Sequence, residues 1–183
     1  MKPDKIFHIS ENGEIDIFKP RPSPSRFKKL DADVVFGISG KLLHNYLLPR
    51  DCPRVTYYAG NETSQADRET FLQTSADSVI AIESGWIPTI EKSILFCYEF
   101  DGETFSMIDE CADYYVSFEA VKPLNIRRID NILEELFKRK NLELKILPEL
   151  WTIADKVVKS SLNFSLIRTR NATAKQVSIY FAT

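Results

Sequence analysis

The fold of this chain is decided by Asp33-Val34-Val35-Phe36-Gly37-Ile38-Ser39-Gly40-Lys41-Leu42-Leu43-His44-Asn45-Tyr46-Leu47-Leu48-Pro49. Residues 34–38 are an apolar run rich in β-branched side chains, which is typical of a strand covered on both faces. Ser39 then predicts the N-cap of a helix whose apolar side chains share one stripe over residues 42–47, and Pro49 ends this helix. A strand that leads through small residues into a helix is a common place for a bound nucleotide.

A second strand is predicted at Lys5-Ile6-Phe7-His8-Ile9-Ser10, which carries a His-x-Ser motif. Together with the central stretch it resembles the ADP-ribosyltransferase fold of the His-Tyr-Glu type, as in poly(ADP-ribose) polymerases. The resemblance covers the first quarter of the chain, and the matching residues are His8, Ser10, Phe36, Asn45 and Tyr46. This chain departs from the family at Ile9, where the family has Gly, at Val35, where it has an aromatic residue, and at Leu43, where it has a small hydroxyl residue.

The resemblance implies a binding site for NAD, used as a substrate, with no metal. It implies that Tyr46 stacks on the nicotinamide ring by cation–π attraction, while His8 and Ser10 hold the ribose. Cleavage of the glycosidic bond also needs a carboxylate near the developing positive sugar. One of three strand-borne glutamates is predicted to supply it: Glu83, which is favoured, Glu99 or Glu119.

Four arginines are predicted to meet the pyrophosphate of a bound dinucleotide, because the forked guanidinium group matches phosphate oxygens. They are Arg21 and Arg26 in a proline-rich basic loop, and Arg50 and Arg54 beside the proline-flanked turn that follows the central helix. The alternative reading places the loop in solvent and gives the two later arginines a structural role.

A broader resemblance links almost the whole chain to an uncharacterised family of bacterial proteins. Its blocks here are residues 7–11, 46–55 and 163–168. This resemblance implies no activity, so the chemistry has to be argued from the residues themselves.

The length of 183 residues predicts a single domain of the α+β class, with a mainly antiparallel bent or split sheet and helices packed on it. Residues 1–121 form the mainly β ligand-binding part in this prediction, and residues 122–183 form a helical cover and a final strand. Trp151 belongs to an apolar helical stripe and is predicted to lie in the core.

Composition narrows the class of protein. The 44% of hydrophobic and 27% of charged residues are ordinary for a soluble globular chain, and no stretch is long enough to cross a bilayer. Three unevenly spaced cysteines predict reduced thiols in a cytoplasmic protein, and two histidines offer no metal cluster. The acidic side chains gather in residues 61–120, but the basic last third lacks the exposed aromatic residues expected of a nucleic-acid interface.

Three functions therefore compete. The first is an NAD-dependent ADP-ribosyl or related glycosyl transferase whose acceptor is unknown. The second is a nucleotide-binding module on the same fold without catalysis, which Ile9 and Leu43 favour because both would crowd the nicotinamide. The third is an unrelated small-molecule or protein-interaction module.

Overall fold

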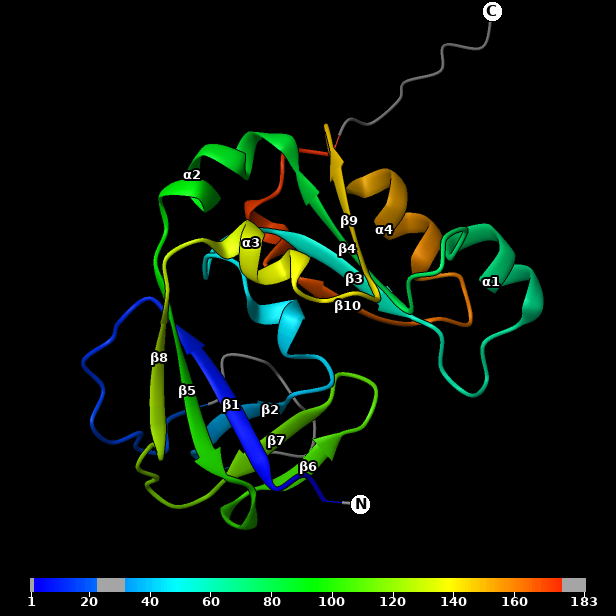
Figure 1. The fold of residues 1–183 in the computed structure, drawn as a ribbon. Helices are drawn as coiled ribbons and strands as arrows, with labels where there is room; N and C mark the ends of the chain where they lie inside the picture. The colour runs from blue at the N-terminus through cyan, green and yellow to red at the C-terminus, as the bar shows by residue number, and fades with distance from the viewer. Residues whose placement is uncertain (1, 23–31, 176–183) are drawn as a thin grey trace, which may run out of the picture. The chain divides into compact units, whose positions relative to one another are not determined.

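The computed structural model describes residues 2–22 and 32–175, which fold as two compact units (Figure 1). Unit 1 comprises Met1–Arg50 and Pro88–Leu142, and unit 2 comprises Asp51–Ile87 and Glu143–Thr183. The predicted α+β class with a split, mainly antiparallel sheet is confirmed, since the strands form two separate sheets. The units cut across the division predicted at residue 121, because each is assembled from two separate stretches of chain.

Unit 1 is built on a six-stranded sheet in the order β6-β7-β2-β1-β5-β8. Its strands are β1 (Lys5–Ser10), β2 (Val35–Ser39), β5 (Leu95–Asp101), β6 (Ser106–Asp109), β7 (Tyr114–Ser117) and β8 (Asn125–Ile129). Its helical segments are η1 (Leu43–Tyr46), η3 (Gly102–Thr104) and α3 (Ile132–Phe137), together with most of α2 (Ile87–Lys92). The neighbouring strands pair antiparallel, and β8 forms one edge of the sheet with four exposed residues.

The register of β1 assigns its side chains to the two faces of this sheet. Ile6 pairs with Phe100 of β5 and with Ser39 of β2, whereas Phe7 pairs with Glu99 and Ile38. Because successive side chains of a strand point to opposite faces, the sheet has an Ile6 face and a Phe7 face. The Ile6 face carries the core of unit 1: Ile6, Phe18, Val35, Tyr98, Phe100, Phe105, Tyr115 and Val121.

The segment between β1 and β2 covers the Ile6 face. The Tyr98 hydroxyl donates to the carbonyl of Asn12 at 2.7 Å and accepts from the Ile15 amide at 3.1 Å. Phe18 then forms a backbone bridge with Val121, and its ring meets those of Tyr98 and Phe100 edge to face, with centroids 4.9 and 5.0 Å away. These contacts hold the segment down on the sheet.

The predicted central helix is shorter and tighter than expected. Residues 42–47 contain a single 3-10 turn, η1, and no side chain caps it. Ser39 was the predicted cap, but its hydroxyl donates to the Asp113 carboxylate and accepts from the amide of Lys41. Ser39 therefore fixes the turn after β2 instead of starting a helix.

Unit 2 contains a four-stranded sheet in the order β10-β3-β4-β9. Its strands are β3 (Arg54–Tyr58), β4 (Ser78–Glu83), β9 (Leu142–Leu147) and β10 (Asn163–Ile167), and its helical segments are α1 (Gln65–Phe71), η2 (Ser84–Trp86), α4 (Trp151–Val157) and η4 (Thr169–Asn171). The helices α1 and α4 cover one face of the sheet. The core there consists of Val55, Tyr57, Phe71, Val79, Ala81, Leu150, Ala154, Val157 and Leu162.

Two helices begin at a polar residue whose side chain caps the first turn. Asn131 caps α3 by accepting from the amide of Glu134 at 3.0 Å, which confirms the capping motif in the sequence. Ser64 caps α1 by accepting from the amide of Asp67. None of the helices within residues 2–22 and 32–175 has the length and apolar character needed to cross a membrane.

A substitution at Gly37 tests how tightly the Ile6 face is packed. A methyl group added there would lie 2.2 Å from Cγ2 of Ile6 and 3.2 Å from Cε1 of Phe105, both in the core. We expect Gly37→Ala to lower the free energy of unfolding by about 1–3 kcal/mol, measured by urea denaturation.

Gly85→Ala is the matched control, because nothing lies within 4 Å of an added methyl group at Gly85. Its urea midpoint should stay close to that of the parent chain. Equal midpoints for the two variants would mean that the Ile6 face can relax around Gly37.

Candidate anion-binding site

His8 lies in β1 and reaches across to β2. The ladder between these strands joins Ile6 to Ser39 and Phe7 to Ile38, and one residue later Nδ1 of His8 lies 2.9 Å from the carbonyl oxygen of Phe36. A carbonyl oxygen can only accept, so Nδ1 carries the hydrogen in this bond. Nε2 of the neutral ring then keeps its lone pair and can accept from another donor.

The His8 imidazole is neutral at physiological pH. Burial lowers its pKa from 6.5 to about 4, the hydrogen bond to Phe36 acts in the opposite direction, and the positive charges of Arg21 and Arg50 lower the pKa further. Both arginines therefore lie near enough for their charges to act on the ring. The edge of Phe18 covers another side of it, with ring centroids 5.0 Å apart.

Backbone hydrogen bonds fix where the two arginines lie along the chain of unit 1. Arg21 exchanges two backbone hydrogen bonds with Val34, at 3.2 and 3.0 Å, immediately before β2. The Arg50 amide donates to Oε1 of Glu11 at 3.0 Å, just beyond the end of β1. Both arginines are exposed, so unit 1 carries two permanent positive charges whose field reaches a neutral imidazole.

Ser10 lies on the same face of β1 as His8, but its hydroxyl stabilises the turn that follows β1. Its hydroxyl accepts from the Asn12 amide at 3.0 Å, and the side chain of Asn12 accepts from the Glu14 amide at 2.9 Å. These bonds shape the turn that carries Glu11, the residue that anchors Arg50. Ser10 thus supports the arginine cluster through the backbone.

Tyr46 lies on the opposite face of the sheet from His8, so the expected pairing of these two side chains is wrong. Tyr46 packs on Tyr114, with ring centroids 6.1 Å apart and their hydroxyl groups in contact. Tyr114 pairs with Ile38 and therefore belongs to the Phe7 face, together with Phe36. The register of β1 and β2 therefore separates Tyr46 from His8, and NAD binding by this pair of residues stays a prediction.

The three candidate glutamates lie in different surroundings. Glu99 pairs with Phe7, which places it on the Phe7 face, and its carboxylate binds Lys5 at 2.7 Å. Glu119 is exposed just after β7. Glu83 belongs to unit 2, where it is buried and accepts from the amide and hydroxyl of Thr173.

Arg54, also predicted to meet a phosphate, has a structural role instead. Arg54 is buried in unit 2, only 2% exposed, and its guanidinium donates to the carbonyl of Cys52 at 2.9 Å. Arg26 lies outside the described residues. Of the three singled-out arginines that the structure describes, the candidate site therefore contains Arg21 and Arg50.

Cys52 and Cys97 offer no activated thiolate. Burial raises the pKa of Cys52 to about 11, and Cys97 shows the same shift for the same reason. Within the described part of the chain, the acidic residues, histidines and cysteines form no group of three or more that could hold a metal ion.

A comparison with protein families matches residues 7–172 to a family of unknown function, DUF6886. The chain belongs to the DUF6886 family. No curated protein and no solved structure matches this DUF6886 chain. The family match agrees with the broader resemblance seen in the sequence, and it leaves the ADP-ribosyltransferase resemblance without support.

Sequence reasoning missed two residues of the site in this DUF6886 chain. Glu11 carries no predicted role in the sequence, although its carboxylate accepts from the amide of Arg50, 39 positions later in the chain. Phe18 carries no predicted role either, and nothing local shows that its ring would meet His8. Both contacts join residues that are distant in sequence, so no short motif contains them.

The lowered pKa of His8 predicts how stability depends on pH. An imidazole with a pKa near 6.5 when unfolded and about 4 when folded binds more protons in the unfolded state between these values. We therefore expect the contribution of His8 to the free energy of unfolding to be fully present above pH 6.5. As the pH falls to 4, this contribution should be lost, by up to about 3 kcal/mol.

His8→Gln should remove this part of the pH dependence while its amide can still donate to Phe36. His44 is buried with a pKa also lowered to about 4, so His44→Gln assigns the second of the two histidine signals. Imidazole NMR titrations of the parent chain and both variants provide the measurement. A His8 signal that titrates near pH 6.5 would contradict this account.

Proposed function

We propose that this chain binds a phosphorylated small molecule of the nucleotide class at the site formed by His8, Arg21 and Arg50. The observation that carries the proposal is that Arg21 and Arg50, both exposed and both tied by their backbone to the ends of β1 and β2, carry positive charges that lower the pKa of the neutral His8. Arginine pairs are well suited to phosphate because each guanidinium offers several N–H donors in a fixed plane.

The imidazole of His8 adds a group of different character. With Nδ1 bound to Phe36, Nε2 is available as an acceptor for a hydroxyl group. A ligand that carries a phosphate and a sugar hydroxyl would use both kinds of group, and this combination describes a nucleotide. The Glu11 carboxylate partly offsets the arginine charges, but it is occupied by the Arg50 amide.

Binding is better supported than glycosyl transfer. Cleavage of NAD would call for an aromatic platform and a carboxylate beside the group that holds the ribose. Tyr46 and Glu99 lie on the Phe7 face, whereas His8 lies on the Ile6 face. We therefore infer a nucleotide-binding module and keep ADP-ribosyl transfer as the alternative that the second experiment below addresses.

Replacement of the arginines tests the site directly. We expect Arg21→Ala and Arg50→Ala each to weaken binding of ADP-ribose about 10- to 100-fold, because each removes a charge-assisted hydrogen bond worth about 1.5–3 kcal/mol. The affinity of each variant should also depend less on salt concentration. Isothermal titration calorimetry at two ionic strengths measures both effects.

Arg128→Ala is the matched control, because it also removes one exposed arginine charge from unit 1. Arg128 lies on the edge strand β8, where its guanidinium pairs with Asp130. It should leave the affinity nearly unchanged. Loss of binding in all three variants would point to a general effect of net charge. Absence of any binding of ADP-ribose, NAD or ADP to the parent chain would overturn the proposal.

A second experiment separates binding from transfer. We expect purified protein to bind NAD without releasing nicotinamide, since the aromatic residue and the ribose-binding histidine do not share a face. Chromatography of NAD incubated with the chain measures the product. Nicotinamide release that drops about 100-fold in Glu83→Gln, Glu99→Gln or Glu119→Gln would establish the transferase instead.

A further inference from the structure

The end of the described chain forms a strap, residues 172–175, across helix α4 of unit 2. The strap follows η4. The side chain of Asn171, the last residue of η4, donates to the carbonyl of Asp51 at 2.8 Å and fixes this turn in place. The residue before η4, Arg168, has a left-handed backbone conformation with φ 54°. The chain is thus turned sharply before the strap begins.

The first contact of the strap is with a buried carboxylate. Glu83 is 4% exposed, and the Thr173 amide lies 3.0 Å from both of its oxygens. The Thr173 hydroxyl donates to Oε2 at 3.1 Å. Within residues 2–22 and 32–175, these are the hydrogen-bond donors that the structure gives to Glu83, and Glu83 forms no ion pair there.

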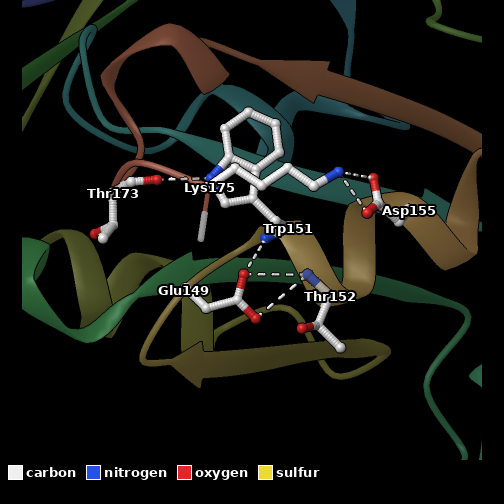
Figure 2. Close-up of polar contacts among 6 residues, drawn as sticks. All are labelled: Glu149, Trp151, Thr152, Asp155, Thr173 and Lys175. Carbon is white, nitrogen blue, oxygen red and sulfur yellow. Dashed lines mark hydrogen bonds and ion pairs between the residues drawn. The ribbon is translucent and has the colours of Figure 1, made fainter. Parts of the chain in front are cut away.

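Two further groups bind the strap on α4 (Figure 2). The Trp151 indole N–H donates to the Thr173 carbonyl at 2.6 Å. Lys175 places its ammonium 2.7 and 2.5 Å from the two oxygens of Asp155 and 5.6 Å from the centre of the Trp151 ring. Trp151, predicted as core, is instead half-buried and uses its polar edge for the strap.

We propose that Glu83, Trp151 and Asp155 form a peptide-recognition site for an extended Thr-x-Lys segment, and that the chain's own strap occupies it. Each receptor group meets a different feature of the segment. Glu83 accepts the amide and hydroxyl of Thr, Trp151 donates to the Thr carbonyl, and Asp155 with the indole ring holds the Lys ammonium.

The buried position of Glu83 makes this site selective. A buried carboxylate that loses its donors keeps the full cost of its lost hydration, so the occupant has to provide N–H and O–H groups. A Val in place of Thr has a similar shape but leaves one carboxylate oxygen without the hydroxyl. The site therefore distinguishes Thr or Ser from an apolar residue of the same size.

A segment from another chain can replace the strap only in competition with it. A tethered segment acts at an effective concentration of the order of millimolar, which weakens the apparent binding of a free peptide. The Lys175–Asp155 pair is about half exposed and adds little stability by itself. The strap is thus held mainly through Thr173, and changes there should release it.

The test uses the full chain with the double substitution Thr173→Pro/Lys175→Ala, which removes the amide, hydroxyl and ammonium donors of the strap. The probe is the peptide Asn-Ala-Thr-Ala-Lys, the sequence of residues 171–175. The indole N–H signal of Trp151 in ¹⁵N NMR spectra reports binding, and Trp86 serves as the internal reference.

We expect the double variant to bind the peptide at least 10-fold more tightly than the wild-type chain does, with a shift of the Trp151 indole signal. The matched peptide with Val in place of Thr should bind at least 10-fold more weakly. Glu83→Gln added to the double variant should also reduce binding, because an amide accepts less strongly than a carboxylate.

Light scattering on the wild-type chain identifies the source of the segment. A monomer at every concentration supports occupation of the site by the chain's own strap. Dimers that increase with concentration would mean that the strap of a second copy fills the site, and would overturn the assignment of the strap to its own chain.

A folded double variant whose Trp151 signal does not move at millimolar peptide would overturn the proposal, as would equal binding of the Thr and Val peptides. Should the double variant lose its dispersed NMR spectrum, Thr173→Ala/Lys175→Ala replaces it. That pair of substitutions keeps the backbone amide of residue 173 and removes the hydroxyl and ammonium donors of the strap.

Discussion

The hydrogen bond between the His8 imidazole and the Phe36 carbonyl lies where the pairing of β1 with β2 ends. The two strands share two residue pairs, while β1 continues beside β5 for six. This arrangement fixes the register of β1, and the register decides which side chains meet. It places His8 with Phe18 and the arginines on the Ile6 face, and it places Phe7 with the surroundings of Tyr46.

Much of the fold could be predicted from the sequence. The apolar run at residues 34–38 falls in the mostly buried strand β2, because its side chains are needed on both faces of a sheet, and residues 5–10 form β1 as predicted. The helix predicted over residues 42–47 is reduced to a 3-10 turn, because Ser39 forms a hydrogen bond with Asp113, which lies 74 positions later, instead of capping a helix.

The functional residues were harder to predict, for a related reason. The motif with His8 and Tyr46 specifies residue types and spacing, but a shift of one position in strand register reverses the face of every side chain. Spacing alone therefore cannot show that two residues meet. Arg21 and Arg50 were identified by charge, whereas Arg54, equally charged, lies buried next to Cys52. Helical periodicity likewise placed Trp151 in the core and gave no sign of the strap that its indole binds.

The edge strand β8 has a consequence for how unit 1 behaves at high concentration. Its consecutive arginines, Arg127 and Arg128, pair with Glu135 and Asp130 and point to opposite faces of the sheet. A foreign strand that extended the sheet along β8 would have to desolvate charge on both of its faces. The exposed Ile126 between Asn125 and Arg127 would otherwise favour such addition. The two arginines thus act as gatekeepers that protect an open sheet edge against fibril growth.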